Sequence, residues 1–270
     1  MMYSDVLYAV GRGEFESVRE DILRLLRDDT FVRWVRFHHM GSLLYDLLPG
    51  AKEVFLLDRA TSMNRWLLWN DLRDILVRSP VPVMAFKGVA VGELYPDRFQ
   101  RFISDVDLWV ERGDMEEMTA YLTSFGLRWE MDVPNQRIFR YEGLPVEVHT
   151  AFTRFPYPDG IGVKEVLTHR RRVEGSLFFP DESLSLSILY LHAYKSMYVR
   201  TSFKAIWWYD ERLLLGRGAK PVGGRVIEAC RRWFSSVGPE DLRGEHLEDT
   251  LFNRLKYLWH GFRLRLLSLL

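Results

Sequence analysis

Cysteine is almost absent from this 270-residue sequence, in which Cys230 is the single one. One thiol can form neither an intrachain disulfide nor a metal site built from several thiolates. No apolar run reaches the roughly 18 residues that a membrane-spanning helix requires, so we expect no membrane span. The N-terminal residues lack a basic region followed by an apolar block, so we expect no secretion signal and a cytoplasmic protein.

An excess of charge of either sign is also missing, because 37 Lys and Arg residues balance 37 Asp and Glu residues. The chain therefore has no overall field that would attract nucleic acid or an anionic membrane, and a nucleic-acid partner is not favoured. Lysine is scarce too, with seven among the 37 basic residues. Because lysine is scarce, a lysine that lies next to candidate functional residues is evidence that it contributes to their function.

Helical periodicity marks both ends of the chain. Apolar residues recur every three to four positions, as at Phe15, Val18, Ile22 and Leu25, which predicts amphipathic helices through residues 1–80. The same spacing returns after residue 180 and predicts a second helical region over 181–270.

The middle of the chain has a different pattern. Short apolar runs predict strands at 81–87 and 105–110, separated by a short helix at 88–95 and a loop. A helix at 112–126 and three β-rich runs follow. We therefore predict an α+β protein in which a small mixed-sheet α/β core, residues 81–180, lies between helical regions 1–80 and 181–270.

Two aspartates interrupt the second of these strands. Side chains alternate faces along a strand, so Asp105 and Asp107 point together while Val106 and Leu108 enter the core. Two like charges so close are costly unless a cation lies between them, and carboxylate oxygens suit Mg²⁺ or Mn²⁺. Glu147, flanked by valines in a later strand, is a candidate third ligand.

Several residues near this strand could hold phosphate oxygens. Lys87 and Gly88 lie where the first strand ends and a short helix begins, so a cation and backbone N–H groups are available together. Arg101 and Ser104 precede the acidic strand and could add contacts. Alternatively, Lys87 extends to solvent, and the carboxylates form a solvated strand face.

The order of these residues resembles the nucleotidyltransferase superfamily of DNA polymerase β type, and most closely a bacterial group of uncharacterised nucleotidyltransferases. The resemblance spans about residues 80 to 215 and is carried by Lys87-Gly88, the Ser104-Asp105-Val106-Asp107-Leu108 run and Val146-Glu147-Val148-His149. It implies that Asp105 and Asp107 bind metal and that Glu147 is the third carboxylate, which takes the proton of an acceptor hydroxyl. The implied reaction moves an NMP from an NTP to an unidentified hydroxyl, with release of pyrophosphate.

One departure from that pattern supports a competing hypothesis. The superfamily generally has Gly-Ser where this chain has Lys87-Gly88, and a shorter interval than the seventeen positions from Gly88 to Asp105. The chain could therefore be a catalytically inactive nucleotide-binding or regulatory protein that keeps the fold.

Other polar residues have structural explanations that we prefer. They include the His38-His39 pair and the later-helix residues His192, Lys195 and Asp210. The basic run 169–172 could meet a polyanionic acceptor, although a solvated turn is the simpler explanation. The predicted C-terminal helix 247–270 ends in an apolar segment, 258–270, that could lie on a membrane or pair with another subunit, although packing within its own helical domain is the simpler explanation. His149 shares a face with Glu147 and could steady a phosphate or the acceptor, although a hydrogen-bonded structural role is the simpler explanation.

Overall fold

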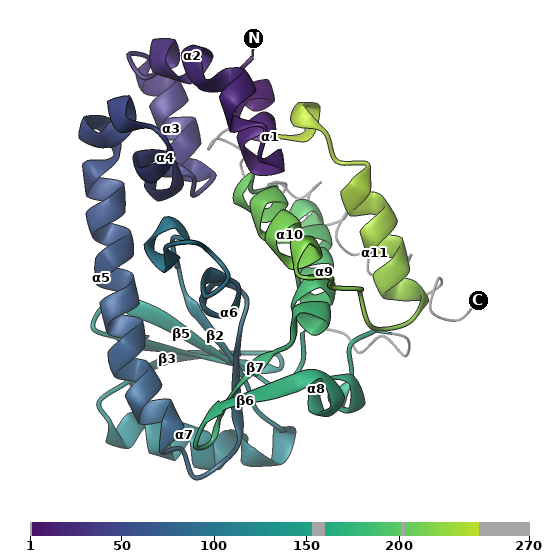
Figure 1. Cartoon of the computed structure of the whole chain (residues 1–270). Helices are drawn as coiled ribbons and strands as arrows, with labels where there is room; N and C mark the ends of the chain where they lie inside the picture. The colour runs from purple at the N-terminus through teal and green to yellow at the C-terminus, as the bar shows by residue number, and fades with distance from the viewer. Residues whose placement is uncertain (1, 153–159, 201–202, 243–270) are drawn as a thin grey trace.

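Five α-helices occupy most of the chain from Tyr3 to Val77. The computed structural model describes residues 2–152, 160–200 and 203–242, and Figure 1 shows their arrangement. The N-terminal helices are α1 (Tyr3–Arg12), α2 (Phe15–Leu25), α3 (Asp29–Phe37), α4 (Gly41–Leu47) and α5 (Lys52–Val77). The C-terminal helices are α9 (Glu182–Arg200), α10 (Ile206–Gly216) and α11 (Arg225–Ser235). The predicted helix at 247–270 lies outside the described residues.

Within the described residues, seven strands form one mixed sheet in the order β3-β4-β5-β2-β1-β7-β6. Its strands are β1 (Val83–Phe86), β2 (Val106–Trp109), β3 (Arg128–Val133), β4 (Gln136–Tyr141), β5 (Leu144–His149), β6 (Arg170–Glu174) and β7 (Leu177–Pro180). The central strand β2 is parallel to β5 and antiparallel to β1, which is parallel to β7. The α+β class with a mixed sheet is therefore confirmed.

The sequence pattern missed one edge of this sheet. The basic run that we interpreted as a solvated turn is strand β6, which pairs antiparallel with β7. Its arginines lie over aromatic rings of β7, with the Arg170 guanidinium 4.4 Å from the centre of the Phe178 ring. A short helix, α8 (Val163–His169), precedes it.

Helices cover both faces of the sheet. On one face, α5 and α7 (Met115–Ser124) pack on inward-facing residues of the central strands, among them Val83, Val106 and Val146. On the other face, Met84, Phe86 and Trp109 pack against α9. Successive residues of β2 thus alternate between the two faces, which places Asp107 on the α9 side together with Trp109.

The helices from the two ends of the chain form one further core (Figure 1). Helix α1 lies against α10, and a Cβ atom at Gly11 would stand 2.9 Å from the backbone oxygen of Ala205. This shared core lies beside the sheet, so α9 and α10 reach over the edge at which β1 ends and β2 begins (Figure 1). The proposed division of the chain at residues 80 and 180 stays a prediction.

Among residues 2–152, 160–200 and 203–242, every helix is too short or too polar to cross a membrane. The cytoplasmic location stays a prediction.

Candidate active site

Strand pairing brings two of the predicted carboxylates together. In the parallel pair of β2 and β5, Asp107 stands opposite Glu147, and Trp109 stands opposite His149. Ligand atoms of Asp107, Glu147 and His149 all lie within 4.8 Å of one another. The His149 Nε2 atom is 3.0 Å from Asp107 Oδ1 and 3.4 Å from Glu147 Oε2. These residues therefore form one compact group on the α9 face of the sheet.

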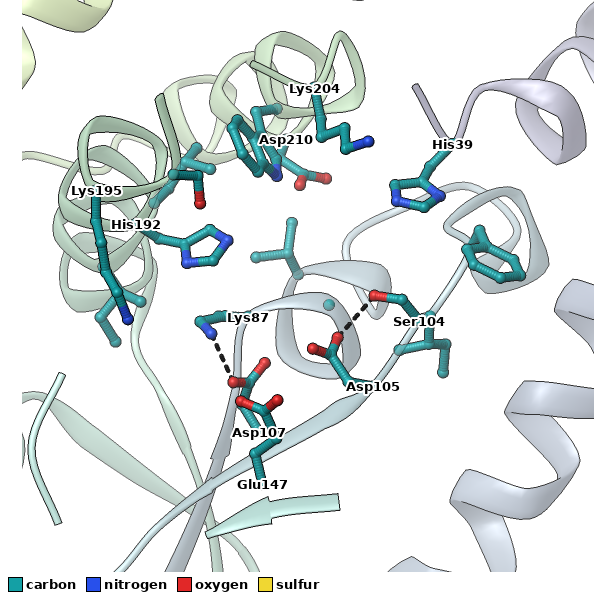
Figure 2. A pocket seen from close by; sticks show the side chains of 18 of the residues that line it. His39, Lys87, Ser104, Asp105, Asp107, Glu147, His192, Lys195, Lys204 and Asp210 are labelled. Atoms are coloured by element: carbon teal, nitrogen blue, oxygen red, sulfur yellow. Dashed lines mark hydrogen bonds and ion pairs between the residues drawn. The ribbon is translucent and has the colours of Figure 1, made fainter. Parts of the chain in front are cut away.

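Asp105 lies directly before β2 and completes the acidic group. Its carboxylate accepts a hydrogen bond of 2.7 Å from the Ser104 hydroxyl, and it is half-buried where Asp107 is fully buried. Figure 2 shows the side chains of Asp105, Asp107 and Glu147 converging on the same space.

Lys87 lies at the junction between β1 and α6 (Gly88–Gly92) and turns toward these carboxylates. Its Nζ atom donates to Asp107 Oδ1 at 2.5 Å (Figure 2). Lys87 adopts the left-handed region, with φ of 57° and ψ of −124°, which is strained for a residue other than glycine. The backbone turn thus directs the scarce lysine into the acidic group.

The charges in this group shift one another's pKa values. Burial alone would raise the pKa of Asp107, but the Lys87 ammonium and the His149 contact hold it well below its usual range. Burial and the neighbouring Asp107 charge raise the pKa of Asp105. Burial would lower the pKa of Lys87, yet the surrounding carboxylates outweigh it and raise the value, so the amine is an ammonium. For Glu147, the His149 contact and Lys87 outweigh burial and lower the pKa.

The chemistry of this donor set fits a hard divalent cation. Mg²⁺ and Mn²⁺ prefer carboxylate oxygens, and the carboxylates of Asp107 and Glu147 lie within 4.8 Å of a histidine nitrogen that Mn²⁺ also accepts. The Asp105 carboxylate lies nearby but outside this compact group (Figure 2). A bound cation would also favour the charged form of Asp105, whose pKa is otherwise raised.

Arg101 and Ser104 lie in the loop between α6 and β2. The Arg101 guanidinium donates to both carboxylate oxygens of Asp210 on α10, at 2.9 to 3.2 Å, and to the Phe102 backbone oxygen at 2.7 Å. The Tyr95 hydroxyl donates to the same aspartate at 2.6 Å. Arg101 is therefore anchored to the C-terminal helices, although an arginine has five N–H donors and some remain for another acceptor.

All seven predicted site residues line one cavity of about 620 Å³. They are Lys87, Gly88, Arg101, Ser104, Asp105, Asp107 and Glu147. The opposite wall consists of α9 and α10, from which His192 and Lys195 extend toward Lys87 (Figure 2). The structure thus brings the predicted residues together, while their roles stay predictions.

Sequence reasoning gave little weight to the basic residues of the opposite wall. Lys195 and Lys204 line the cavity with Lys87, so three of the seven lysines gather there. Lysine scarcity was the signal that could have identified them. His39 also lines the cavity, stacked on Phe102 with ring centres 5.2 Å apart. Burial and the charges of Lys204 and Arg101 lower the pKa of His39 to about 3, so this ring is neutral at neutral pH.

The sequence profile of a family described as uncharacterised nucleotidyltransferase matches residues 26–233, which is most of the chain. The chain belongs to this uncharacterised nucleotidyltransferase family. The matched range includes the whole sheet, the cavity and the helices α9 and α10. The resemblance inferred from the sequence motifs is confirmed.

Two solved structures of the antibiotic-resistance factor ANT(2'')-Ia are similar to this chain. The solution structure has 14% sequence identity and a TM-score of 0.45, and covers 75% of this chain and 98% of its own. The crystal structure in complex with adenylyl-2''-tobramycin has 13% identity and a TM-score of 0.44, and covers 64% and 98%. At such TM-scores the similarity adds nothing to the family assignment. No curated protein matches the chain.

Proposed function

We propose that this family member is an active, metal-dependent nucleotidyltransferase that moves an NMP from an NTP to an acceptor hydroxyl and releases pyrophosphate. The single observation that carries the proposal is the in-register pairing of Asp107 with Glu147 across β2 and β5, beside Asp105 and inside a cavity of about 620 Å³. Three neighbouring carboxylates, of which Asp107 is fully buried and the other two are half-buried, repel one another, whereas a bound divalent cation would offset their charge and that of a polyphosphate.

The proposed reaction follows from the positions of these groups. The acceptor oxygen attacks the α-phosphorus, and the bond from that phosphorus to the β-phosphate oxygen breaks. Pyrophosphate leaves with the electron pair. Glu147, which its lowered pKa keeps ionised at neutral pH, would accept the proton of the acceptor hydroxyl. Asp105, Asp107 and Glu147 would hold Mg²⁺ or Mn²⁺, which neutralises phosphate charge as the reaction proceeds.

The proposed nucleotide contacts are Lys87, Gly88, Arg101 and Ser104. They share the cavity wall on the side of α6 and the loop before β2, so phosphates placed above the carboxylates would lie within their reach. Arg101 would contribute the N–H donors that its ion pair with Asp210 does not use. Positioning and charge stabilisation would supply most of the rate, as is usual for phosphoryl and nucleotidyl transfer.

The test is pyrophosphate release from each NTP with Mg²⁺, over a panel of hydroxyl-bearing acceptors, by the wild type and by Asp107→Asn. We expect the substitution to abolish release while far-ultraviolet circular dichroism stays unchanged. Equal release by both purified proteins would refute the proposal. Mg²⁺-dependent NTP binding without product from any acceptor would instead favour the nucleotide-binding or regulatory alternative.

Nucleic acid is not the favoured acceptor, because the chain has no net charge to bind a polyanion. An RNA end that accepts the NMP, with affinity that falls steeply as salt rises, would overturn this part of the proposal.

A further inference from the structure

Lys87 lies against an oxygen of Asp107 that a second metal ion would need as a ligand. Its Nζ atom is 2.5 Å from Asp107 Oδ1, and the same oxygen is 3.0 Å from His149 Nε2. Its side chain is 22% exposed, and that of Asp107 is 1% exposed. The contact is therefore enclosed by the protein and little screened by water.

One of the two oxygens of Asp107 is thus already occupied. A carboxylate shared by two metal ions presents one oxygen to each of them, and two-metal sites place their ions only about 4 Å apart. Asp107 Oδ1 accepts from Lys87 and lies against His149, which leaves Oδ2 for a metal ion. Asp107 can therefore serve one metal ion without loss of its protein contacts.

The net charge of the group also favours a single divalent ion. Asp105, Asp107 and Glu147 carry three negative charges when ionised, and the Lys87 ammonium cancels one of them. In the absence of nucleotide, one divalent cation neutralises the remainder. A second divalent ion would have to lie beside the ammonium, where like charges repel within a poorly screened cavity.

The backbone conformation of Lys87 also indicates that its side chain has a defined position. Among the described residues, four other than glycine have positive φ values: His39, Lys87, Asn135 and Glu142. Asn135 and Glu142 lie in the tight turns that join β3 to β4 and β4 to β5, where such values are common. Lys87 is in no hairpin turn, and glycine would occupy its position with less strain. A lysine occupies this position although its backbone conformation is strained. This strain indicates that the ammonium has a function there.

On these grounds, we propose that the Lys87 ammonium replaces one of the two divalent ions, so that the chain binds a single divalent ion at these carboxylates together with the nucleotide. This inference rests on the proposed function. Lys87 acts as a positioning residue: it keeps its proton, holds Asp107 and supplies positive charge beside the metal. Its other N–H donors still allow contact with a phosphate oxygen.

The test counts Mn²⁺ ions bound per chain, by electron paramagnetic resonance of free Mn²⁺, with a non-hydrolysable NTP analogue at saturation. We expect one ion for the wild type and two for Lys87→Met, which keeps the length of the side chain and removes its charge. Without the analogue, we expect the first ion to bind about tenfold or more tightly to the variant, since the repulsion is gone. Lys220→Met, an exposed lysine outside the cavity, should match the wild type in both measurements.

Two bound ions in the wild type would overturn the inference and leave the proposed function in place, and this count needs no variant. One ion in a folded Lys87→Met protein would overturn it as well. If Lys87→Met fails to fold, Lys87→Gln replaces it. If the wild type binds no Mn²⁺ at all, the metal-dependent function fails together with the inference.

Discussion

The buried pair of Arg101 and Asp210 provides the sharpest prediction about stability. Asp210→Asn keeps the shape of the side chain but removes its negative charge. The Arg101 side chain is 10% exposed and that of Asp210 is 2% exposed, so the arginine charge would stay buried without a counter-charge. Breaking a buried ion pair in this way costs roughly 3–5 kcal/mol, because the remaining charge cannot be solvated. The Tyr95 hydroxyl bond to the same carboxylate would weaken as well.

The assay is guanidinium unfolding of the wild type and of Asp210→Asn, followed by tryptophan fluorescence. A second variant that replaces both partners, Arg101→Met with Asp210→Leu, should recover much of the lost stability, since no charge remains buried. A loss below about 1 kcal/mol in Asp210→Asn, the range of exposed ion pairs, would refute the reasoning. It would mean that Arg101 reaches water or another partner.

Two further predictions concern parts of the fold away from the carboxylates. Burial raises the pKa of the Cys230 thiol to about 12, so a thiol reagent at pH 8 should modify the native protein far more slowly than the unfolded chain, and equal rates would contradict this burial. Gly11→Ala should destabilise the protein by about 1–3 kcal/mol, because the new Cβ would lie 2.9 Å from the Ala205 oxygen. The matched Gly216→Ala at the end of α10, with open space around its Cβ, should be neutral or stabilising when both glycine variants are compared by guanidinium unfolding.

Strand periodicity predicted the centre of the sheet. Alternation along 105–110 placed Asp107 on the face opposite Val106 and Leu108, and the structure agrees. The prediction succeeds because the face on which a strand residue lies depends only on its position within the strand. Apolar spacing likewise predicted the flanking helices. Strands β6 and β7 were missed because β7 pairs in parallel with β1, across some ninety residues, and because an arginine-rich edge strand resembles a solvated turn.

The candidate site was predictable in its residue types but not in its contacts. Asp107 and Glu147 were named from their apolar surroundings, whereas their pairing in register depends on the β2–β5 alignment. The partner of Arg101 is Asp210, more than a hundred residues away on α10, which no local pattern reveals. For Lys87 the sequence suggested phosphate contact or extension to solvent but not the contact with Asp107, because the direction of the side chain depends on a left-handed backbone turn that side-chain chemistry does not encode.

The most direct test of the central claim is anomalous diffraction from crystals soaked with Mn²⁺ and a non-hydrolysable NTP analogue. The account predicts an anomalous peak within about 2.0–2.3 Å of carboxylate oxygens from Asp105, Asp107 and Glu147, with the triphosphate beside it. A peak bound by other residues, or none at these three carboxylates while the nucleotide is present, would contradict it.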